Sequence, residues 1–77
     1  ISVSSYDMSI IYDIVFEVLK KCKCVMLFVS LEDSKIKLRF ILDEDIDIIM
    51  ANNISFKKCI YGEDTELIYS FKRSDAL

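Results

Sequence analysis

The sequence of 77 residues contains no histidine, no proline and no tryptophan, and it has a single glycine, Gly62. Histidine is the commonest general base and the commonest metal ligand, so its absence removes the usual starting point for catalysis or zinc binding. Disordered segments and flexible linkers are rich in proline and glycine, so their scarcity here indicates an ordered chain. Any catalysis would therefore depend on carboxylates, cysteines, lysines or tyrosines.

Long apolar runs and an excess of positive charge are also missing. Residues 24–29 form the longest apolar stretch, far short of the ~20 residues that span a bilayer. The net charge of −3 provides no general attraction to nucleic acid or to an anionic membrane. Residues 1–7 also lack the basic region of a signal peptide. We therefore expect a cytoplasmic protein that binds no nucleic acid and inserts no part of this segment into a membrane.

Cysteine is present only as Cys22, Cys24 and Cys59. An odd number, with one residue between the first two, argues against a disulfide framework and indicates reduced thiols. The C-x-C spacing differs from the C-x-x-C of redox and zinc sites, and no second pair follows. We interpret Cys24 as strand core and Cys22 as the end of an apolar helix face.

The chain is rich in apolar residues, which make up 53% of the sequence. This content supplies a core even though so short a chain buries a smaller fraction of its surface than a larger one. The length allows a single domain over residues 1–77. Because the first residue is Ile1 and not methionine, the chain could be a C-terminal fragment of a larger protein.

The first helix is expected from Ser4 or Ser5, which can cap it, to about Cys22. Apolar residues recur there at helical spacing and define one face: Met8, Ile11, Val15, Val18, Leu19 and Cys22. Tyr12 and Phe16 lie beside the polar stripe, away from this face. They are either ordinary flanking residues or the residues that dock a protein partner.

A β-hairpin should follow this helix. Cys24–Leu31 is dense in large apolar residues, which favours a buried, central strand. Glu32, Asp33 and Ser34 supply a turn. Lys35–Leu42 then alternates apolar and polar residues, which predicts a strand with one wet face.

The second half of the chain predicts a short helix and another hairpin. The helix would occupy residues 43–53, and strands would occupy residues 54–61 and 65–72 around Gly62. Residues 73–77 read as a frayed tail. The pattern predicts an α+β fold of order α-β-β-α-β-β. It would be a two-layer sandwich, with helices on one face of a four-stranded mixed or antiparallel sheet.

Acidic residues are densest at the start of the expected second helix. Asp43, Asp45 and Asp47 have the first spacings of a calcium loop. Ile48 and Ile54 occupy the positions where that loop requires glycine and glutamate. We therefore interpret the cluster as acidic residues favoured by a helix dipole, and we predict no metal site.

Basic residues gather on one face of the second expected strand, at Lys35, Lys37 and Arg39. No recognition module or aromatic platform accompanies them. Together with the negative net charge, this favours a solvated face over a nucleic-acid site.

Three stretches resemble the later part of the ATP-binding domain of sensor histidine kinases, in the GHKL group of ATPases. They are the helix "IIYDIVFEVLKK", the hairpin "VMLFVSLEDSKIKLRFILDED" and the terminal "ELIYSFKR". The resemblance covers the order and length of elements over most of the chain. It implies an α+β ATPase scaffold from a two-component signalling system.

The resemblance suggests two candidate ATP-binding residues, and the chain departs from the family pattern in three places. Glu17 matches the glutamate of the family's first helix, and Asp43 matches the adenine-reading aspartate of its D-x-G-x-G motif. Lys21 stands where the family has a magnesium-binding asparagine, and Lys cannot ligate a cation. Asp45 and Asp47 replace both glycines, which the backbone needs to approach a phosphate. The family's glycine-rich lid is also absent, so the resemblance implies a degenerate or partial form without ATP binding.

Three functions remain open from the sequence. The first is a non-catalytic signalling domain that binds a protein through Tyr12 and Phe16 or through an unpaired sheet edge. The second is a fragment of an active histidine kinase, with Glu17 and Asp43 binding ATP and magnesium and the remaining motifs outside this chain. The third is a small structural module that self-associates. We predict no catalytic residue, and no cofactor under the first and third functions.

Overall fold

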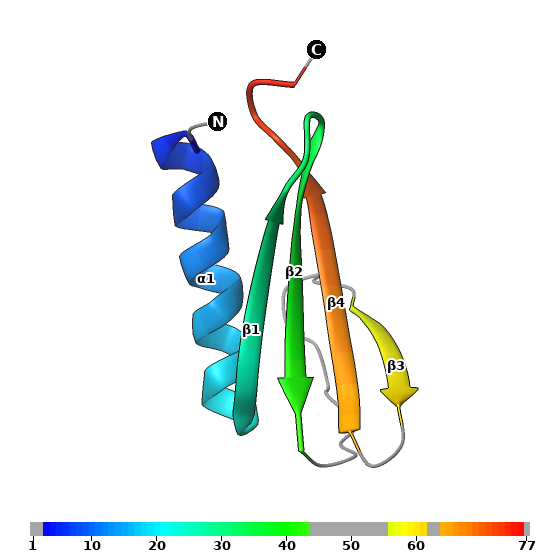
Figure 1. Cartoon of the computed structure of the whole chain (residues 1–77). Coiled ribbons are helices and arrows are strands. Elements are labelled where there is room, and N and C mark those ends of the chain that lie inside the picture. Colours follow the sequence, from blue (N-terminus) through cyan, green and yellow to red (C-terminus); the bar gives the residue numbers. More distant parts are fainter. Residues whose placement is uncertain (1–2, 44–55, 62–63, 77) are drawn as a thin grey trace.

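The computed structural model describes residues 3–43, 56–61 and 64–76, and for residues 58–61 it describes the backbone alone. The described chain has one helix and four strands joined in one antiparallel sheet, in the order β1-β2-β4-β3 (Figure 1). The elements are α1 (Ser5–Lys21), β1 (Cys24–Leu31), β2 (Lys35–Leu42), β3 (Lys57–Tyr61) and β4 (Asp64–Lys72).

Helix α1 begins where the sequence predicts. The Ser4 hydroxyl caps it by accepting a hydrogen bond from the backbone N–H of Asp7 at 3.1 Å. Lys20 and Lys21 lie in the last turn, where positive charge complements the helix dipole. The helix ends at Cys22, whose extended backbone leads directly into the sheet.

The core lies between α1 and the inner face of β2 and β4. Ile36, Leu38, Phe40 and Leu42 alternate along β2 with no exposed surface, which confirms the predicted wet and dry faces of this strand. Across the core they face Ile11, Ile14, Val18 and Cys22 of the helix, and Leu67 of β4 lies beside Phe40 on the same face of the sheet. The hairpin of β1 and β2 has the predicted bounds, and its two-residue turn is closed by a 3.0 Å bond from Glu32 N–H to the Lys35 carbonyl.

The predicted α-β-β-α-β-β two-layer sandwich is wrong. The described residues contain one helix, in the order α1-β1-β2-β3-β4, and residues 44–55, where the second helix was expected, lie outside them. That prediction assumed that every apolar stripe is buried once. Here α1 and the strands that it covers bury one continuous core, while the apolar residues of β1 remain at the surface.

The prediction that β1 is a central strand is also wrong. Within residues 3–43, 56–61 and 64–76, its one partner in the sheet is β2, so β1 is an edge strand there. A dense apolar run normally indicates burial on both faces. Strand β1 lies at the edge because the other side of β2 pairs with β4. This pairing joins segments far apart in the sequence, so a local apolar run does not report it.

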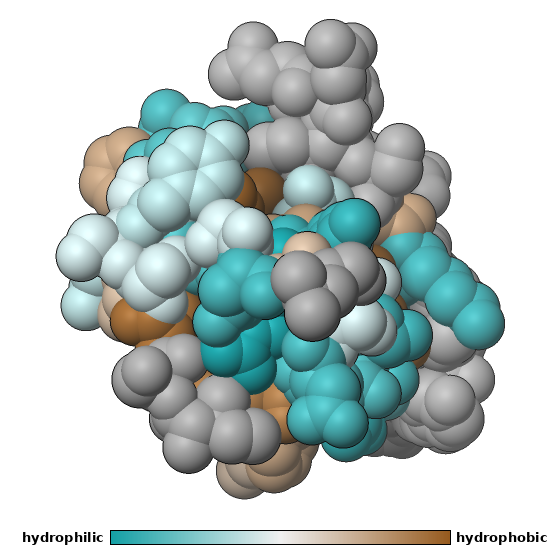
Figure 2. Space-filling model, turned by 90° about the horizontal axis from the view of Figure 1, so that it is seen from above, coloured by the Kyte–Doolittle hydropathy of each residue, from teal (hydrophilic) through white to brown (hydrophobic). Residues whose placement is uncertain are grey.

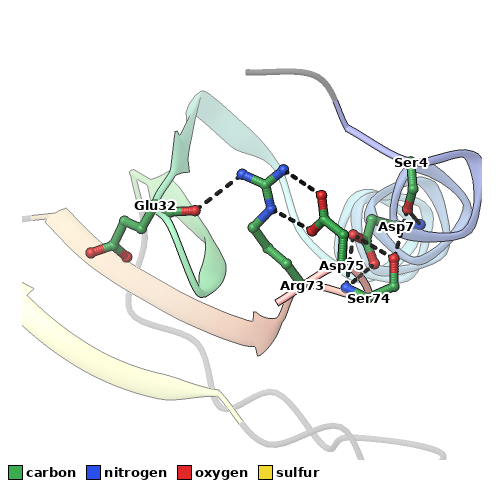
Figure 3. A network of polar contacts seen from close by, with 6 residues as sticks. All are labelled: Ser4, Asp7, Glu32, Arg73, Ser74 and Asp75. Atoms are coloured by element: carbon green, nitrogen blue, oxygen red, sulfur yellow. Dashed lines mark hydrogen bonds and ion pairs between the residues drawn. The ribbon is translucent and has the colours of Figure 1, made fainter. Parts of the chain in front are cut away.

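The tail after β4 is docked and not frayed, which corrects a further prediction (Figure 3). Asp7 is almost fully buried, and its carboxylate accepts hydrogen bonds from the Ser74 backbone N–H at 3.1 and 3.2 Å. The Ser74 hydroxyl lies 3.1 Å from the same carboxylate and 2.9 Å from the Ser4 hydroxyl. The tail is thereby joined to the first turn of α1.

Arg73 joins the same tail to the turn between β1 and β2. Its guanidinium donates to both carboxylate oxygens of Asp75, at 3.0 and 3.1 Å, and to the Glu32 carbonyl at 3.1 Å (Figure 3). Its backbone N–H donates to the Ser34 carbonyl at 3.0 Å. This end of the molecule is mostly hydrophilic at its surface (Figure 2).

The Asp75–Arg73 pair predicts a pH dependence of stability. Hydrogen bonds from the Arg73 guanidinium, followed by its charge, hold the pKa of Asp75 below its usual value. A carboxylate with a lowered folded-state pKa stabilises the fold above its unfolded pKa and loses this effect as the pH falls through the folded value. Asp75→Asn should therefore lower Tm at neutral pH, and the difference should vanish in acid. A difference that stays constant down to acid pH would contradict this assignment.

Replacing Thr65 on β4 by valine should stabilise the fold. Its hydroxyl is buried and has no hydrogen-bond partner within the described part of the chain. An unpaired buried hydroxyl costs free energy, so Thr65→Val should raise the free energy of unfolding by about 1 kcal/mol. Urea denaturation measures this change, with Thr65→Ser as the control that keeps the hydroxyl. Clear destabilisation by valine would show that the hydroxyl is paired.

Candidate interaction surface

Strand β1 exposes an unusual number of large apolar side chains. Six of its eight residues are large apolar residues that are 36 to 57% exposed: Val25, Met26, Leu27, Phe28, Val29 and Leu31. The pairing with β2 places Leu27, Val29 and Leu31 on the inner face of the sheet, opposite fully buried residues. Met26 and Phe28 lie on the outer face. The strand is therefore apolar on both faces.

The outer edge of β1 offers backbone groups for pairing. Glu32 N–H donates to the Lys35 carbonyl, so Glu32 and Lys35 form a hydrogen-bonded pair of the β1–β2 ladder. Hydrogen-bonded pairs alternate with non-bonded pairs along an antiparallel ladder, so this pair fixes the type of the pairs before it. Leu27, Val29 and Leu31 fall on the non-bonded positions. Their N–H and C=O groups therefore point away from β2, toward the free edge.

Helix α1, which lies next to β1 (Figure 1), carries a second set of exposed apolar residues. Tyr12, Phe16 and Leu19 recur at helical spacing and are 65, 64 and 55% exposed. Helix α1 runs antiparallel to β1 (Figure 1), and these three residues lie off its buried face, which contains Ile11, Ile14 and Val18. The "β1–α1 surface" is defined here as the six exposed apolar residues of β1 together with the three exposed residues of α1.

The outer sheet face carries a separate hollow of about 530 Å³. Its lining mixes basic, acidic and apolar residues: Lys37, Arg39, Ile41, Asp64, Glu66 and Ile68. Arg39 and the nearly buried Glu66 form a 2.5 Å ion pair within it, and the Arg39 guanidinium also lies 5.2 Å from the Phe28 ring centroid. The predicted basic face is thus partly neutralised by acidic residues of β4.

The residues suggested by the histidine-kinase resemblance occupy surface positions. The Glu17 carboxylate forms ion pairs with Lys20 at 3.5 Å and with Lys21 at 3.7 Å. Asp43 is exposed directly after β2. Neither residue lines the outer-face hollow. Their proposed role in ATP binding stays a prediction, as does docking by Tyr12 and Phe16.

Within the described ranges, no group of three or more histidine, cysteine, aspartate or glutamate side chains is arranged to hold a metal ion. The acidic residues at positions 44, 45 and 47 lie outside those ranges. Helix α1 is too short and too polar to cross a membrane. The thiols of Cys22 and Cys24 donate to the carbonyls of Val18 and Met26, each at 3.1 Å.

Comparisons with protein-family models, with curated proteins and with solved structures found no match to this chain.

Sequence reasoning singled out Tyr12 and Phe16, but it wrongly placed Leu19 on the buried helix face and did not identify β1 as part of the same surface. A run of apolar residues reads alike in a central strand and in an exposed edge strand. One feature of the sequence could have indicated an exposed edge strand. Lys23 on one side and Glu32 and Asp33 on the other flank a strand that contains no charged residue.

Proposed function

We propose that this chain is a non-catalytic protein-interaction domain of a signalling protein, resembling a degenerate ATPase domain of a sensor histidine kinase. Its binding element is the β1–α1 surface. The observation that carries the proposal is the exposure of six large apolar side chains on an edge strand. Thiols at Cys22 and Cys24 fit a reducing, cytoplasmic location.

Exposed apolar residues are common as isolated side chains, but contiguous patches mark binding sites. Here the exposed residues are contiguous along β1, and the neighbouring helix α1 carries three more. Strand edges in monomeric proteins are usually blunted by charged residues or proline. Strand β1 has neither, which favours a binding role over a solvent-facing edge.

The arrangement of Glu17 and Asp43 favours this function over ATP binding. Glu17 is already neutralised by two lysines, and Lys21 sits at the position of the family's magnesium ligand. The glycines that admit a phosphate are replaced by Asp45 and Asp47. Added carboxylates would repel a triphosphate, which also carries negative charge.

Isothermal titration with magnesium and ATP tests this proposal. We expect no saturable heat for the chain, and the same result for Glu17→Gln and Asp43→Asn. Saturable micromolar binding that weakens in either variant would instead support a fragment of an active kinase domain. Lys37→Gln, on the opposite face of the sheet, is the control for non-specific charge effects.

A further inference from the structure

We propose that β1 pairs antiparallel with β1 of a second copy of this chain, about a two-fold axis perpendicular to the sheet. This inference rests on the proposed function, since it names the partner that occupies the β1–α1 surface. The result would be one continuous sheet of two domains, with strand β1 of each domain at its centre.

The charges at the two ends of β1 select a second copy as the partner. Lys23 precedes the strand, Glu32 and Asp33 follow it, and all three are exposed. An antiparallel pair of identical strands brings each Lys23 to the acidic turn of its partner, so both ends gain opposite charges. Parallel pairing would instead place lysine beside lysine and acid beside acid.

The backbone of the edge fits the same arrangement. Leu27, Val29 and Leu31 direct their N–H and C=O groups outward. In a two-fold antiparallel pair, opposed residues must lie on the same face, so outward-pointing residues face outward-pointing residues. The register that centres Phe28 on the axis sets Leu27 of one copy opposite Val29 of the other. It also brings Lys23 to the partner's Glu32–Asp33 turn.

The side chains on both faces would then be covered. A perpendicular two-fold axis keeps both α1 helices on the same side of the joined sheet. The exposed helix residues Tyr12, Phe16 and Leu19 of both copies then lie on the same side of the joined sheet as the inner residues of β1. On the outer face, the two Phe28 rings meet at the axis, where aromatic pairs prefer offset or edge-to-face contact.

Sedimentation of the 77-residue chain from low micromolar to near-millimolar concentration tests the pairing. We expect a reversible monomer–dimer equilibrium. Val29→Pro removes an outward N–H without removing a bond to β2, so it should abolish the dimer while the circular dichroism spectrum stays native. Val29→Thr keeps this N–H and is the matched control that should still dimerise.

Charge reversal tests the orientation. Lys23→Glu should weaken dimerisation by roughly tenfold at low salt, because two exposed pairs become repulsive. Adding Glu32→Lys and Asp33→Lys to this variant should restore the dimer. No recovery in the triple variant would overturn the antiparallel arrangement.

A cysteine placed at the axis tests the register. In a background with Cys24→Ser and Cys59→Ser, Phe28→Cys should form a disulfide dimer on oxidation, since opposed residues of an antiparallel pair lie within disulfide distance. Leu27→Cys alone should cross-link poorly, because it faces Val29 of the partner. Equal cross-linking of both variants would overturn the proposed register.

A probe peptide separates failure of this inference from failure of the proposed function. A monomer at every concentration overturns self-pairing. A lysine-flanked Val-Thr-Val-Thr-Val peptide is then titrated against the chain and monitored by amide chemical shifts along β1, with a proline-substituted peptide as control. Binding at β1 would retain the interaction function with another partner, and no binding would overturn both proposals.

Discussion

Phe40→Ala should lower the free energy of unfolding by about 3–5 kcal/mol, because it removes the largest fully buried side chain of the described residues. Phe40 has no exposed surface, lies on the central strand β2, and meets Phe56 edge-on with 6.2 Å between the ring centroids. A domain of this size has a total stability of roughly 4–12 kcal/mol. The variant should therefore be largely unfolded near physiological temperature.

Ile41→Ala is the matched control for Phe40→Ala. Ile41 is the next residue on the same strand, but it lies on the outer face and is partly exposed. Its truncation should cost about 1 kcal/mol, since the lost burial is smaller and no closed cavity forms. Urea denaturation followed by circular dichroism measures both variants. Equal losses would mean that the core does not lie between α1 and the inner face.

Asp7→Ala should destabilise the fold by about 3 kcal/mol, because it removes a buried carboxylate with several hydrogen bonds. Two of its partners are the backbone N–H and the hydroxyl of Ser74, 67 residues away in sequence. Its loss leaves the Ser74 N–H without this acceptor and releases the tail from the first turn of α1. Thermal unfolding should show a large fall in Tm.

Asp13→Ala controls for the loss of an acidic residue on the same helix. Asp13 is exposed, so its removal should change stability by less than about 0.5 kcal/mol. Deleting residues 73–77 should be at least as damaging as Asp7→Ala, since it also removes Arg73. If the truncated chain kept its full stability, the docked tail would have no structural role.

Local patterns in the sequence predicted most of the individual elements. The serine cap and helical spacing gave α1 as Ser5–Lys21, and alternation gave the inner face of β2. The second hairpin is present as Lys57–Tyr61 and Asp64–Lys72, close to the predicted strands. These features depend on contacts between residues near in sequence, which are the contacts that periodicity and turn chemistry report.

Long-range contacts explain what the sequence did not predict. The order β1-β2-β4-β3 places an apolar strand at the edge, and composition alone does not distinguish an edge strand from a central one. The tail looked frayed because its residues are polar. Its order depends on Asp7, and nothing in the local sequence pairs a first-turn aspartate with a serine near the other end of the chain.

The candidate site was predictable only in part. Tyr12 and Phe16 stood out because they leave the main apolar face of a regular helix, and they are exposed as expected. The contribution of β1 required the sheet order. In the proposed function, stability and binding are separated: α1, β2 and β4 form the core, and Asp7 and Arg73 secure the tail. Strand β1, the proposed binding element, stays exposed.

Residue-resolved hydrogen exchange along β1 tests this separation most directly. At low concentration, the amides of Leu27, Val29 and Leu31 should exchange fast, while those of Met26, Phe28 and Ser30 stay protected by β2. At high concentration, or with a bound strand, the first group should become protected as well. If all six amides were equally protected in the dilute monomer, β1 would not be a free edge, and the account would be contradicted.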